Sequence, residues 1–343
     1  MKKKIIISSI ICLVASIVIL FFAQALLVPK YVSASPEGAL TSEYYASVKE
    51  TKHDVLFVGD CEVYESFVPA VLWEKYGISS YVRGSAQQLV WHSYYLLEDA
   101  LRYETPKIVV FNVLALKYGT PQKEAYNRMT IDGMEWSKSK LDCINASMTE
   151  EESLLSYVFP LLRFHSRWDE LSGEDVKYMF DRPTVSDSGY LIQTDVRAAN
   201  PDALAIEGSP LADYTLPKSS MDYLDKMKKL CDDNGIELVL IKAPTNTWRY
   251  WWYDEWDEQI VKYAADNGLT YYNFIDETEQ IGIDWSKDTY DEGVHLNVYG
   301  AMKLSEYFGE ILAKNHNAPD RRADAEFSPV WEKRANEFYS KLE

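Results

Sequence analysis

The chain has 343 residues, of which 47% are hydrophobic and 26% are charged, so it can bury a sizeable core and wholesale disorder is not expected. Its formal net charge is −18 at pH 7. Residues 1–34 hold four lysines and no acid, which leaves a net charge of −22 on the rest of the chain. Because nucleic acids are polyanions and the chain has no basic stripe, we expect no nucleic-acid partner.

The amino terminus predicts a membrane anchor. Three lysines precede Ile5–Val28, an apolar stretch of 24 residues. At ~1.5 Å per residue this stretch spans a hydrocarbon core of ~30 Å, whereas a cleaved signal peptide has an apolar region of ~7–15 residues. We therefore interpret residues 1–31 as cytoplasmic lysines followed by a transmembrane anchor. Ala23–Ala25 and Val32–Ala34 fit the small-residue pattern of a cleavage site, so a cleaved signal peptide stays open as the alternative. The lysines predict a single-pass cell-membrane protein whose main domain is extracytoplasmic.

Beyond a polar spacer at residues 32–52, which allows a short helix at Thr41–Glu50, strands and helices alternate. The predicted strands are Val55–Val58, Ser80–Arg83, Lys107–Val113, Ile236–Lys242 and Leu269–Phe274. The predicted helices are Pro69–Tyr76, Leu89–Tyr103, Ser219–Asn234, Asp254–Asn267 and Val298–Lys314. This alternation is typical of a parallel sheet covered on both faces, so the sequence predicts a three-layer α/β/α domain over residues 53–316.

Two other regions interrupt or follow this alternation. Residues 114–217 are interpreted as an insertion or cap over the sheet, with helical pieces at Glu150–Arg163 and Glu174–Phe180. Residues 317–343 are predicted to be a polar tail with one helix at Pro329–Leu342.

The cysteines do not form a disulfide or metal-binding pattern. Cys12 lies in the apolar stretch, which leaves Cys61, Cys143 and Cys231 as an odd number without paired spacing. We expect no structural metal and no other cofactor, because no CxxC pair or cluster of histidine and cysteine is present.

Two short segments carry the candidate chemistry. Asp54–Cys61 predicts a strand that runs into a tight turn with a thiol at its end, and Asp291–Asn297 places acids and a histidine before an amphipathic helix. Cysteine becomes a nucleophile when a base takes its proton, and the histidine needs a carboxylate to orient it. The pattern predicts acyl transfer by Cys61 and His295; the alternative is that Cys61 is a small buried apolar residue.

The order of these segments resembles that of the SGNH hydrolases, the GDSL esterase and acyltransferase superfamily. Gly59–Cys61 resembles the first block, Gly-Asp-Ser, with cysteine at the serine position. Gly84 resembles the second-block glycine, Asn112 the third-block asparagine, and His295 the fifth-block histidine. The resemblance covers roughly residues 52–316 outside the insertion, and it implies a flavodoxin-like SGNH fold of the membrane-anchored bacterial type.

The resemblance also implies roles for these residues. The oxyanion would be held by the backbone N–H groups of Cys61 and Gly84 and by the amide of Asn112, while a turn-capping role for Asn112 stays open. The usual family spacing would select Glu292 as the triad acid. We favour Asp291, because Gly293 permits a bulged turn that a shorter carboxylate suits.

The insertion supplies candidates for substrate binding. Arg128, His165 and Arg167 could bind a substrate carboxylate or phosphate, or the arginines could pair with local acids such as Asp169. The aromatic run Trp248–Trp256 could stack on sugar rings or pack beneath the cap.

These features together predict an acyl-ester hydrolase or O-acyltransferase that acts on a cell-envelope polysaccharide or acylated glycan. Some anchored relatives work beside membrane-bound O-acyltransferases, and such an enzyme is a candidate partner by analogy. The alternative is a catalytically inactive SGNH-fold protein that binds glycan or assembles a complex in the cell envelope, a role that the cysteine at the nucleophile position favours.

Overall fold

The computed structural model describes residues 2–29, 38–199, 205–207, 211–246, 248–250 and 252–343. Its centre is a five-stranded, entirely parallel sheet in the order β2-β1-β3-β5-β7. The strands are β1 (Val55–Gly59), β2 (Ser80–Gly84), β3 (Ile108–Asn112), β5 (Glu237–Lys242) and β7 (Thr270–Asn273). This order reverses beside β1, as in flavodoxin-like doubly wound sheets, and it confirms the predicted α/β fold class.

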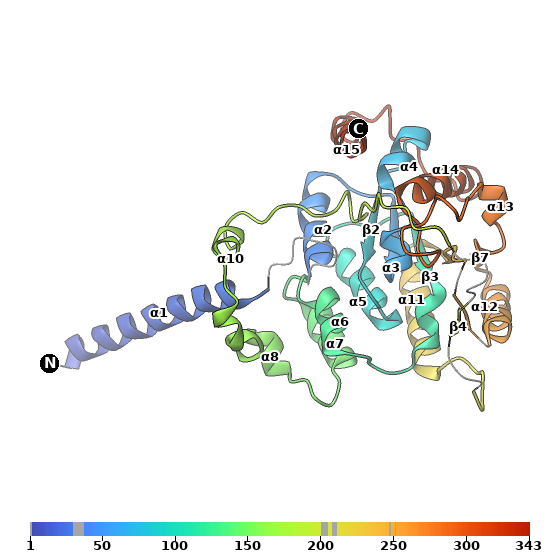
Figure 1. The fold of residues 1–343 in the computed structure, drawn as a ribbon. Coiled ribbons are helices and arrows are strands. Elements are labelled where there is room, and N and C mark those ends of the chain that lie inside the picture. Colours follow the sequence, from blue (N-terminus) through green and yellow to red (C-terminus); the bar gives the residue numbers. More distant parts are fainter. Residues whose placement is uncertain (1, 30–37, 200–204, 208–210, 247, 251) are drawn as a thin grey trace.

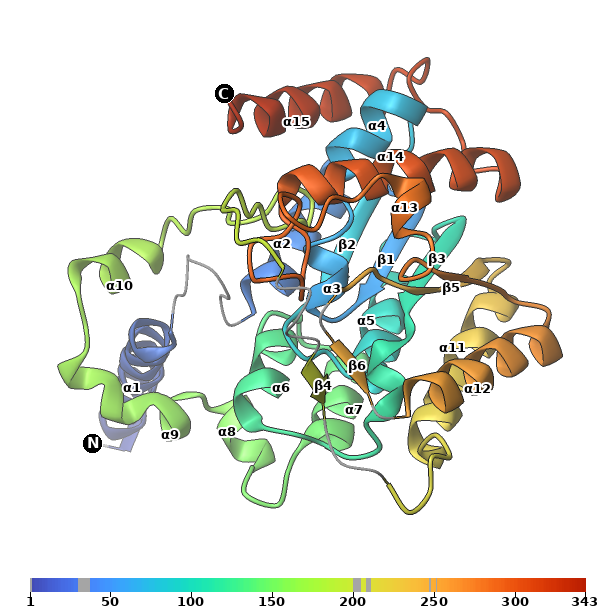
Figure 2. The ribbon, with the colours of Figure 1, turned by 45° about the vertical axis from the view of Figure 1, so that its right-hand side comes forward.

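Alternate residues of β1 face two different helical layers. Val55 and Phe57 pack in a core cluster with α4, α14 and α15, whereas Leu56 and Val58 pack with α2, α5, α11 and α12. Figure 2 shows α4, α14 and α15 above the sheet and α5, α11 and α12 below it. The helices are α2 (Ala39–Glu50), α4 (Pro69–Tyr76), α5 (Val90–Ala100), α11 (Lys218–Asp233), α12 (Tyr253–Asn267), α14 (Val298–Asn315) and α15 (Ser328–Ser340). The three central strands, β1, β3 and β5, are therefore buried on both faces, which explains their apolar runs.

Local sequence signals explain where several of these helices begin and end. Pro69 occupies the first turn of α4, where its missing N–H costs no helical hydrogen bond, and Gly77 ends that helix in a left-handed conformation. Asn297 caps α14, because its side-chain oxygen accepts hydrogen bonds from the N–H groups of Tyr299 and Gly300. This cap fixes the chain entering α14, which is the segment that carries His295.

Residues 114–217, predicted to be an insertion or cap over the sheet, form an insertion whose middle part lies against α1. The segment contains η1 (Val113–Lys117), α6 (Glu124–Ile131), α7 (Lys138–Ser147), α8 (Leu154–Val158), α9 (Leu161–Phe164), η2 (His165–Asp169) and α10 (Gly173–Tyr178). The predicted helix Glu150–Arg163 is split at Pro160, as expected for a residue that cannot continue a helix. Helix α7 packs beside α5, whereas α9, η2 and α10 contact α1 (Lys2–Leu27), away from the sheet (Figure 2).

The insertion returns to the sheet along its β2 edge. The N–H of Val82 donates to the carbonyl of Ser188, and the N–H of Leu191 donates to the carbonyl of Tyr64. The short strands β4 (Ala205–Glu207) and β6 (Trp248–Tyr250) form a separate two-stranded parallel sheet. The segment therefore contacts both the sheet edge and the end of α3 (Cys61–Tyr64).

The helices expected within the spacer and the tail are present as α2 and α15, but both pack in the core instead of lying outside it. Within the predicted spacer, α2 buries Tyr44, Tyr45 and Val48 in the core, while residues 30–37 lie outside the described part. Within the predicted tail, α15 buries Trp331 and Phe338. These two residues lie seven positions apart, so they face one side of the helix and pack toward α4.

Substitution of the buried tryptophan in α15 tests whether the carboxyl terminus is part of the core. Trp331 is fully buried and stacks on Trp73, with ring centroids 5.8 Å apart. Trp331→Ala should lower the free energy of unfolding by ~3–5 kcal/mol, because it removes a large buried side chain and leaves a cavity. The exposed neighbour Lys333 is the control, and Lys333→Ala should change stability by less than ~0.5 kcal/mol in the same chemical denaturation experiment. Equal effects of the two substitutions would contradict the core position of α15.

Candidate active site

The candidate nucleophile lies directly after the central strand. Strand β1 ends at Gly59, Asp60 caps α3, and Cys61 is the first residue of that helix. A Cβ atom at Gly59 would lie 2.4 Å from Val63 Cγ2 and 2.9 Å from Asn112 Cβ, so the turn needs glycine. Gly84 pairs in register with Gly59 at the end of β2, and a Cβ there would lie 3.2 Å from the Asp60 carbonyl oxygen. The two glycines let both strand ends approach the turn that carries Cys61.

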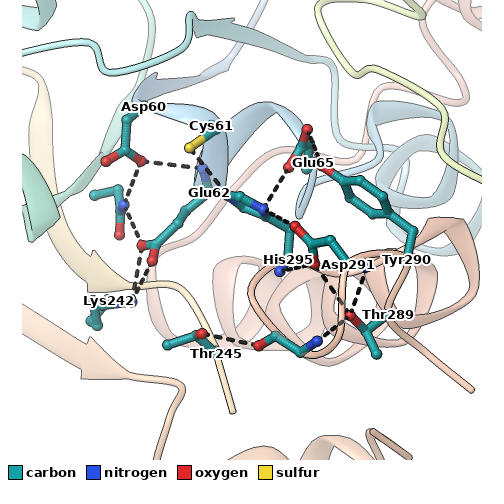
Figure 3. A network of polar contacts seen from close by, with 12 residues as sticks. Asp60, Cys61, Glu62, Glu65, Lys242, Thr245, Thr289, Tyr290, Asp291 and His295 are labelled. Carbon is teal, nitrogen blue, oxygen red and sulfur yellow. Dashed lines mark hydrogen bonds and ion pairs between the residues drawn. The ribbon is translucent and has the colours of Figure 1, made fainter. Parts of the chain in front are cut away.

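Three of the predicted residues meet at this point (Figure 3). His295 Nε2 lies 3.1 Å from Cys61 Sγ, and His295 Nδ1 lies 2.6 Å from Asp291 Oδ2. The backbone N–H of His295 also donates to Asp291 Oδ1 at 2.8 Å. When Nδ1 donates its proton to Asp291, the free lone pair of Nε2 faces the thiol, which is the tautomer that a general base requires.

The turn before His295 determines which acid reaches the imidazole. Glu292 and Gly293 have φ angles of 68° and 98°, a left-handed turn that glycine favours. The N–H of Gly293 donates to Thr289 Oγ1 at 2.8 Å, and its carbonyl accepts from Thr245 Oγ1 at 3.0 Å. In this turn the Asp291 carboxylate contacts the imidazole, whereas Glu292 is exposed.

A second carboxylate, which the sequence analysis missed, also faces the histidine. Glu65 Oε2 lies 3.4 Å from His295 Nδ1 and is buried without a hydrogen-bond partner. The other oxygen of Glu65 accepts a hydrogen bond from the Tyr290 hydroxyl at 2.9 Å, and the Tyr290 ring lies nearly parallel to the imidazole. A signal for Glu65 was present, since residues four apart share one face of a helical turn and Glu65 follows Cys61 by four.

Burial and neighbouring charges shift the ionisation of these groups. Burial raises the pKa of the Cys61 thiol to about 11, although the nearby His295 opposes this shift. Burial disfavours the charged imidazole, but Cys61 and the Asp291 carboxylate outweigh it and raise the pKa of His295 well above its usual value. The charge of Cys61 acts on the imidazole only when the sulfur is a thiolate, so the raised pKa of His295 belongs to the imidazolium–thiolate pair. While the thiol keeps its proton this attraction is absent, and the proton passes from Sγ to Nε2 as the pair forms.

A buried polar network lies beside the nucleophile turn. Glu62 accepts two hydrogen bonds from Lys242 Nζ, at 2.8 and 2.9 Å, and one from Asn112 Nδ2 at 2.8 Å. Asn112 Nδ2 also donates to Asp60 Oδ1 at 3.0 Å, and Asn112 Oδ1 accepts from the Ala243 N–H. Burial and the charge of Glu62 raise the pKa of Asp60 to about 7, although Lys242 opposes this shift. The network joins the ends of β1, β3 and β5.

This network corrects the predicted role of Asn112. A side-chain amide has two N–H bonds, and both are directed to carboxylates of Asp60 and Glu62. Asn112 therefore holds neighbouring strand ends together and has no N–H left for an oxyanion. Glu62 and Lys242 were missed by the sequence analysis, although Lys242 ends a predicted strand on the edge where ligand sites of parallel sheets lie.

The structure does not bring the predicted substrate-binding residues to the triad. Arg128 is buried and donates to Glu124, Asp132 and Ser156. Arg167 pairs with Glu170 and Asp175 and donates to the Leu27 carbonyl, and His165 is exposed near the carbonyl of Leu162. Pairing with nearby acids, the alternative to substrate binding, therefore accounts for the positions of both arginine side chains.

The remaining candidates also lie outside the triad. Of the aromatic run Trp248–Trp256, Tyr253 and Trp256 are buried in the core, and the side chains of residues 248–251 lie outside the described part. A cavity of about 500 Å³ lies between α2, α15 and residues 184–188, and its lining includes none of the three triad residues. Within the described ranges, no group of three or more His, Cys, Asp or Glu side chains is arranged to hold a metal ion.

A double-mutant cycle tests the ion pair of the buried network. Lys242→Met should lower the free energy of unfolding by ~3–5 kcal/mol, because it leaves the Glu62 carboxylate buried without its counter-charge. The double variant Glu62→Gln with Lys242→Met should recover a large part of this loss in urea unfolding. A loss in the double variant equal to the sum of the losses in Glu62→Gln alone and Lys242→Met alone would contradict a coupled pair.

The buried carboxyl of Glu65 should make stability depend on pH. Burial raises its pKa from 4.5 to about 7, although His295 and the Tyr290 hydroxyl oppose this shift. The folded state thus binds this proton more tightly than the unfolded state does. The stabilisation contributed by the bound proton is complete below pH 4.5 and is lost as the pH rises to about 7. Relative to Glu65→Gln, the wild type should lose ~3 kcal/mol of unfolding free energy between pH 4 and pH 8. A difference between the two proteins that is independent of pH would contradict the raised pKa.

Comparisons with known proteins find similar solved structures, but no similar family model or curated protein. No known family model matches the sequence, and no curated protein is significantly similar to it. Among solved structures, a GDSL-like lipase from Bacteroides thetaiotaomicron is 12% identical, with a TM-score of 0.39 over 81% of this chain and 100% of that chain. A TM-score of 0.39 is too low to support the fold class or the site. The fold class follows from the strand order, and the candidate site follows from the distances between its side chains.

Proposed function

We propose that this chain is a membrane-anchored, extracytoplasmic enzyme of the SGNH type that hydrolyses or transfers acyl esters through a Cys61–His295–Asp291 triad. The observation that carries the proposal is the continuous line of contacts from Asp291 through His295 to Cys61, at 2.6 and 3.1 Å. These are the distances and the order of groups that an activated thiol requires.

The reaction proceeds in two acyl transfers. The imidazole accepts the thiol proton as Cys61 Sγ attacks the ester carbonyl, and it then gives this proton to the departing alkoxide, which leaves a thioester on sulfur. A water molecule or an acceptor hydroxyl next gives its proton to His295 and attacks the thioester, which restores the thiol. Asp291 stabilises the imidazolium formed in each transfer, and Glu65 supplies a second nearby carboxyl.

The oxyanion in this mechanism depends on the main chain. Because both N–H bonds of Asn112 are taken, the developing charge would be held by the backbone N–H groups of Cys61 and Gly84, as the family resemblance implies. Each such donor is worth ~3 kcal/mol of transition-state stabilisation.

The amino-terminal helix supports a location outside the cytoplasm. Among the described residues, one helix, Lys3–Leu27, is long and apolar enough to cross a membrane, and an 18-residue stretch within it has a mean hydropathy of 3.1. The lysines before it would remain in the cytoplasm, so the catalytic domain would face the cell envelope. An acylated envelope glycan is the proposed substrate, and a membrane-bound O-acyltransferase is the proposed partner.

Two observations favour an inactive, glycan-binding protein as the second candidate. The pKa of the thiol is raised to about 11 by burial, which disfavours the reactive thiolate. The Asn112 amide is also engaged elsewhere. A general base that removes the proton during attack does not need a preformed thiolate, so we place catalysis first.

Turnover of aryl acetates and of an acetylated glycan by the full chain separates the two candidates. Cys61→Ala and His295→Ala should each abolish turnover, and Asp291→Asn should lower kcat by at least ~100-fold, because the imidazole loses its charged partner. Glu292→Gln is the matched control and should retain activity, since that side chain is exposed in the turn. An acyl adduct on Cys61 in a mass spectrum would support the mechanism. Absence of both turnover and adduct would favour the binding protein.

A further inference from the structure

Seven large apolar side chains of the insertion are exposed on one group of short helices. We name residues 155–180, which cover most of α8, all of α9 and η2, and α10 with the turn after it, the collar. Its exposed apolar residues, between 38% and 75% exposed, are Leu155, Val158, Phe159, Leu162, Trp168, Val176 and Phe180. Exposed apolar residues scattered singly need no explanation, but a concentration on adjacent elements indicates a contact surface.

Three of the four elements of the collar pack against one end of the amino-terminal helix. Helices α9, η2 and α10 all contact α1. Residues 3–22 of α1 are exposed, residues 23–28 are half-buried, and Pro29 is buried. The exposed apolar part, Ile5–Phe22, is ~27 Å long at ~1.5 Å per residue, close to the ~30 Å of a hydrocarbon core. The body therefore begins where a bilayer around α1 would end (Figure 1).

Arg167 joins the collar to this end of α1. Its Nη1 donates to the Leu27 carbonyl at 2.8 Å, and its Nη2 lies 3.2 Å from Asp175 Oδ1 in α10. The last carbonyl groups of a helix lack intrahelical donors, so a cation there satisfies them and interacts favourably with the helix dipole. The contact holds α10 and η2 at the level where α1 leaves its apolar part.

We propose that the collar is a membrane-contacting surface that inserts its apolar side chains into the outer interface of the bilayer around α1. This proposal rests on the proposed membrane anchor. Aromatic residues are enriched at this depth, and the collar supplies Phe159, Trp168 and Phe180. The net charge of −22 beyond residue 34 repels anionic headgroups, so burial of apolar surface, and not charge, holds the collar to lipid. The contact would also fix the orientation of the catalytic edge relative to the membrane.

Labelling by a photoactivatable lipid tests the proposal directly. The full chain is reconstituted into phosphatidylcholine vesicles that contain a phosphatidylcholine with a diazirine in its acyl chain, and adducts are mapped by mass spectrometry after irradiation. Adducts are expected on Ile5–Phe22 and on the exposed collar residues. Trp136 and Val261 are internal controls, because they are 54% and 51% exposed but belong to other surfaces, and they should remain unlabelled.

A pair of surface variants separates specific insertion from general stickiness. Phe159→Ser combined with Leu162→Ser should reduce labelling of the collar at least fivefold, whereas Val261→Ser should leave it unchanged. Adducts on α1 with none on the collar would overturn the proposal and favour a membrane protein as the occupant of this surface. An α1 without adducts would overturn the proposed membrane anchor. Turnover of aryl acetates in the same vesicles tests the catalytic proposal independently of the anchor and of the collar.

Discussion

The contact between the Cys61 sulfur and the His295 imidazole joins groups that are 234 residues apart, at 3.1 Å. It exists because the sheet is parallel, so the turn after β1 and the loop before α14 emerge at the same edge. Two helical layers bury that sheet on both sides, which makes the positions of the strand ends rigid. The Asp291 contact, the Glu65 contact and the glycine turn at Gly59 all serve the geometry of this one pair.

Three buried carboxyl groups lie close to the pair in the sequence and in the fold. Asp60, Glu62 and Glu65 lie within four residues of the nucleophile, and all three are buried. Lys242 and Asn112 satisfy the first two, whereas one oxygen of Glu65 has no hydrogen-bond partner other than its approach to the imidazole. Buried carboxyl groups reduce stability unless they are paired, and here they lie beside the thiol and the histidine.

The insertion connects this site to the amino-terminal helix. Its first part packs beside α5, its middle part packs against the end of α1, and its last part runs along β2. The N–H of Arg197 then donates to the carbonyl of Thr289, and the N–H of Glu292 donates to the carbonyl of Arg197. The insertion thus contacts both the end of α1 and the loop of the candidate triad.

The sequence by itself determined the parallel sheet, the apolar helix and the three residues of the candidate triad. These features follow from local signals: runs of apolar residues, the period of helical faces, and glycine at turns that need it. The turn at Gly293 also favoured Asp291 over Glu292, because backbone geometry there depends mainly on adjacent residues.

Only the tertiary structure decided the partners of buried polar groups. The sequence left Asn112 open between an oxyanion and a turn-capping role, and Arg167 open between a substrate and local acids. In the structure Asn112 donates to the carboxylates of Asp60 and Glu62, and Arg167 contacts Glu170, Asp175 and the last turn of α1. Likewise, α2 and α15 belong to the core, although composition suggested a spacer and a tail. The physical reason is that a hydrogen bond or a packed side chain depends on which distant segment lies opposite, and no local pattern specifies that neighbour.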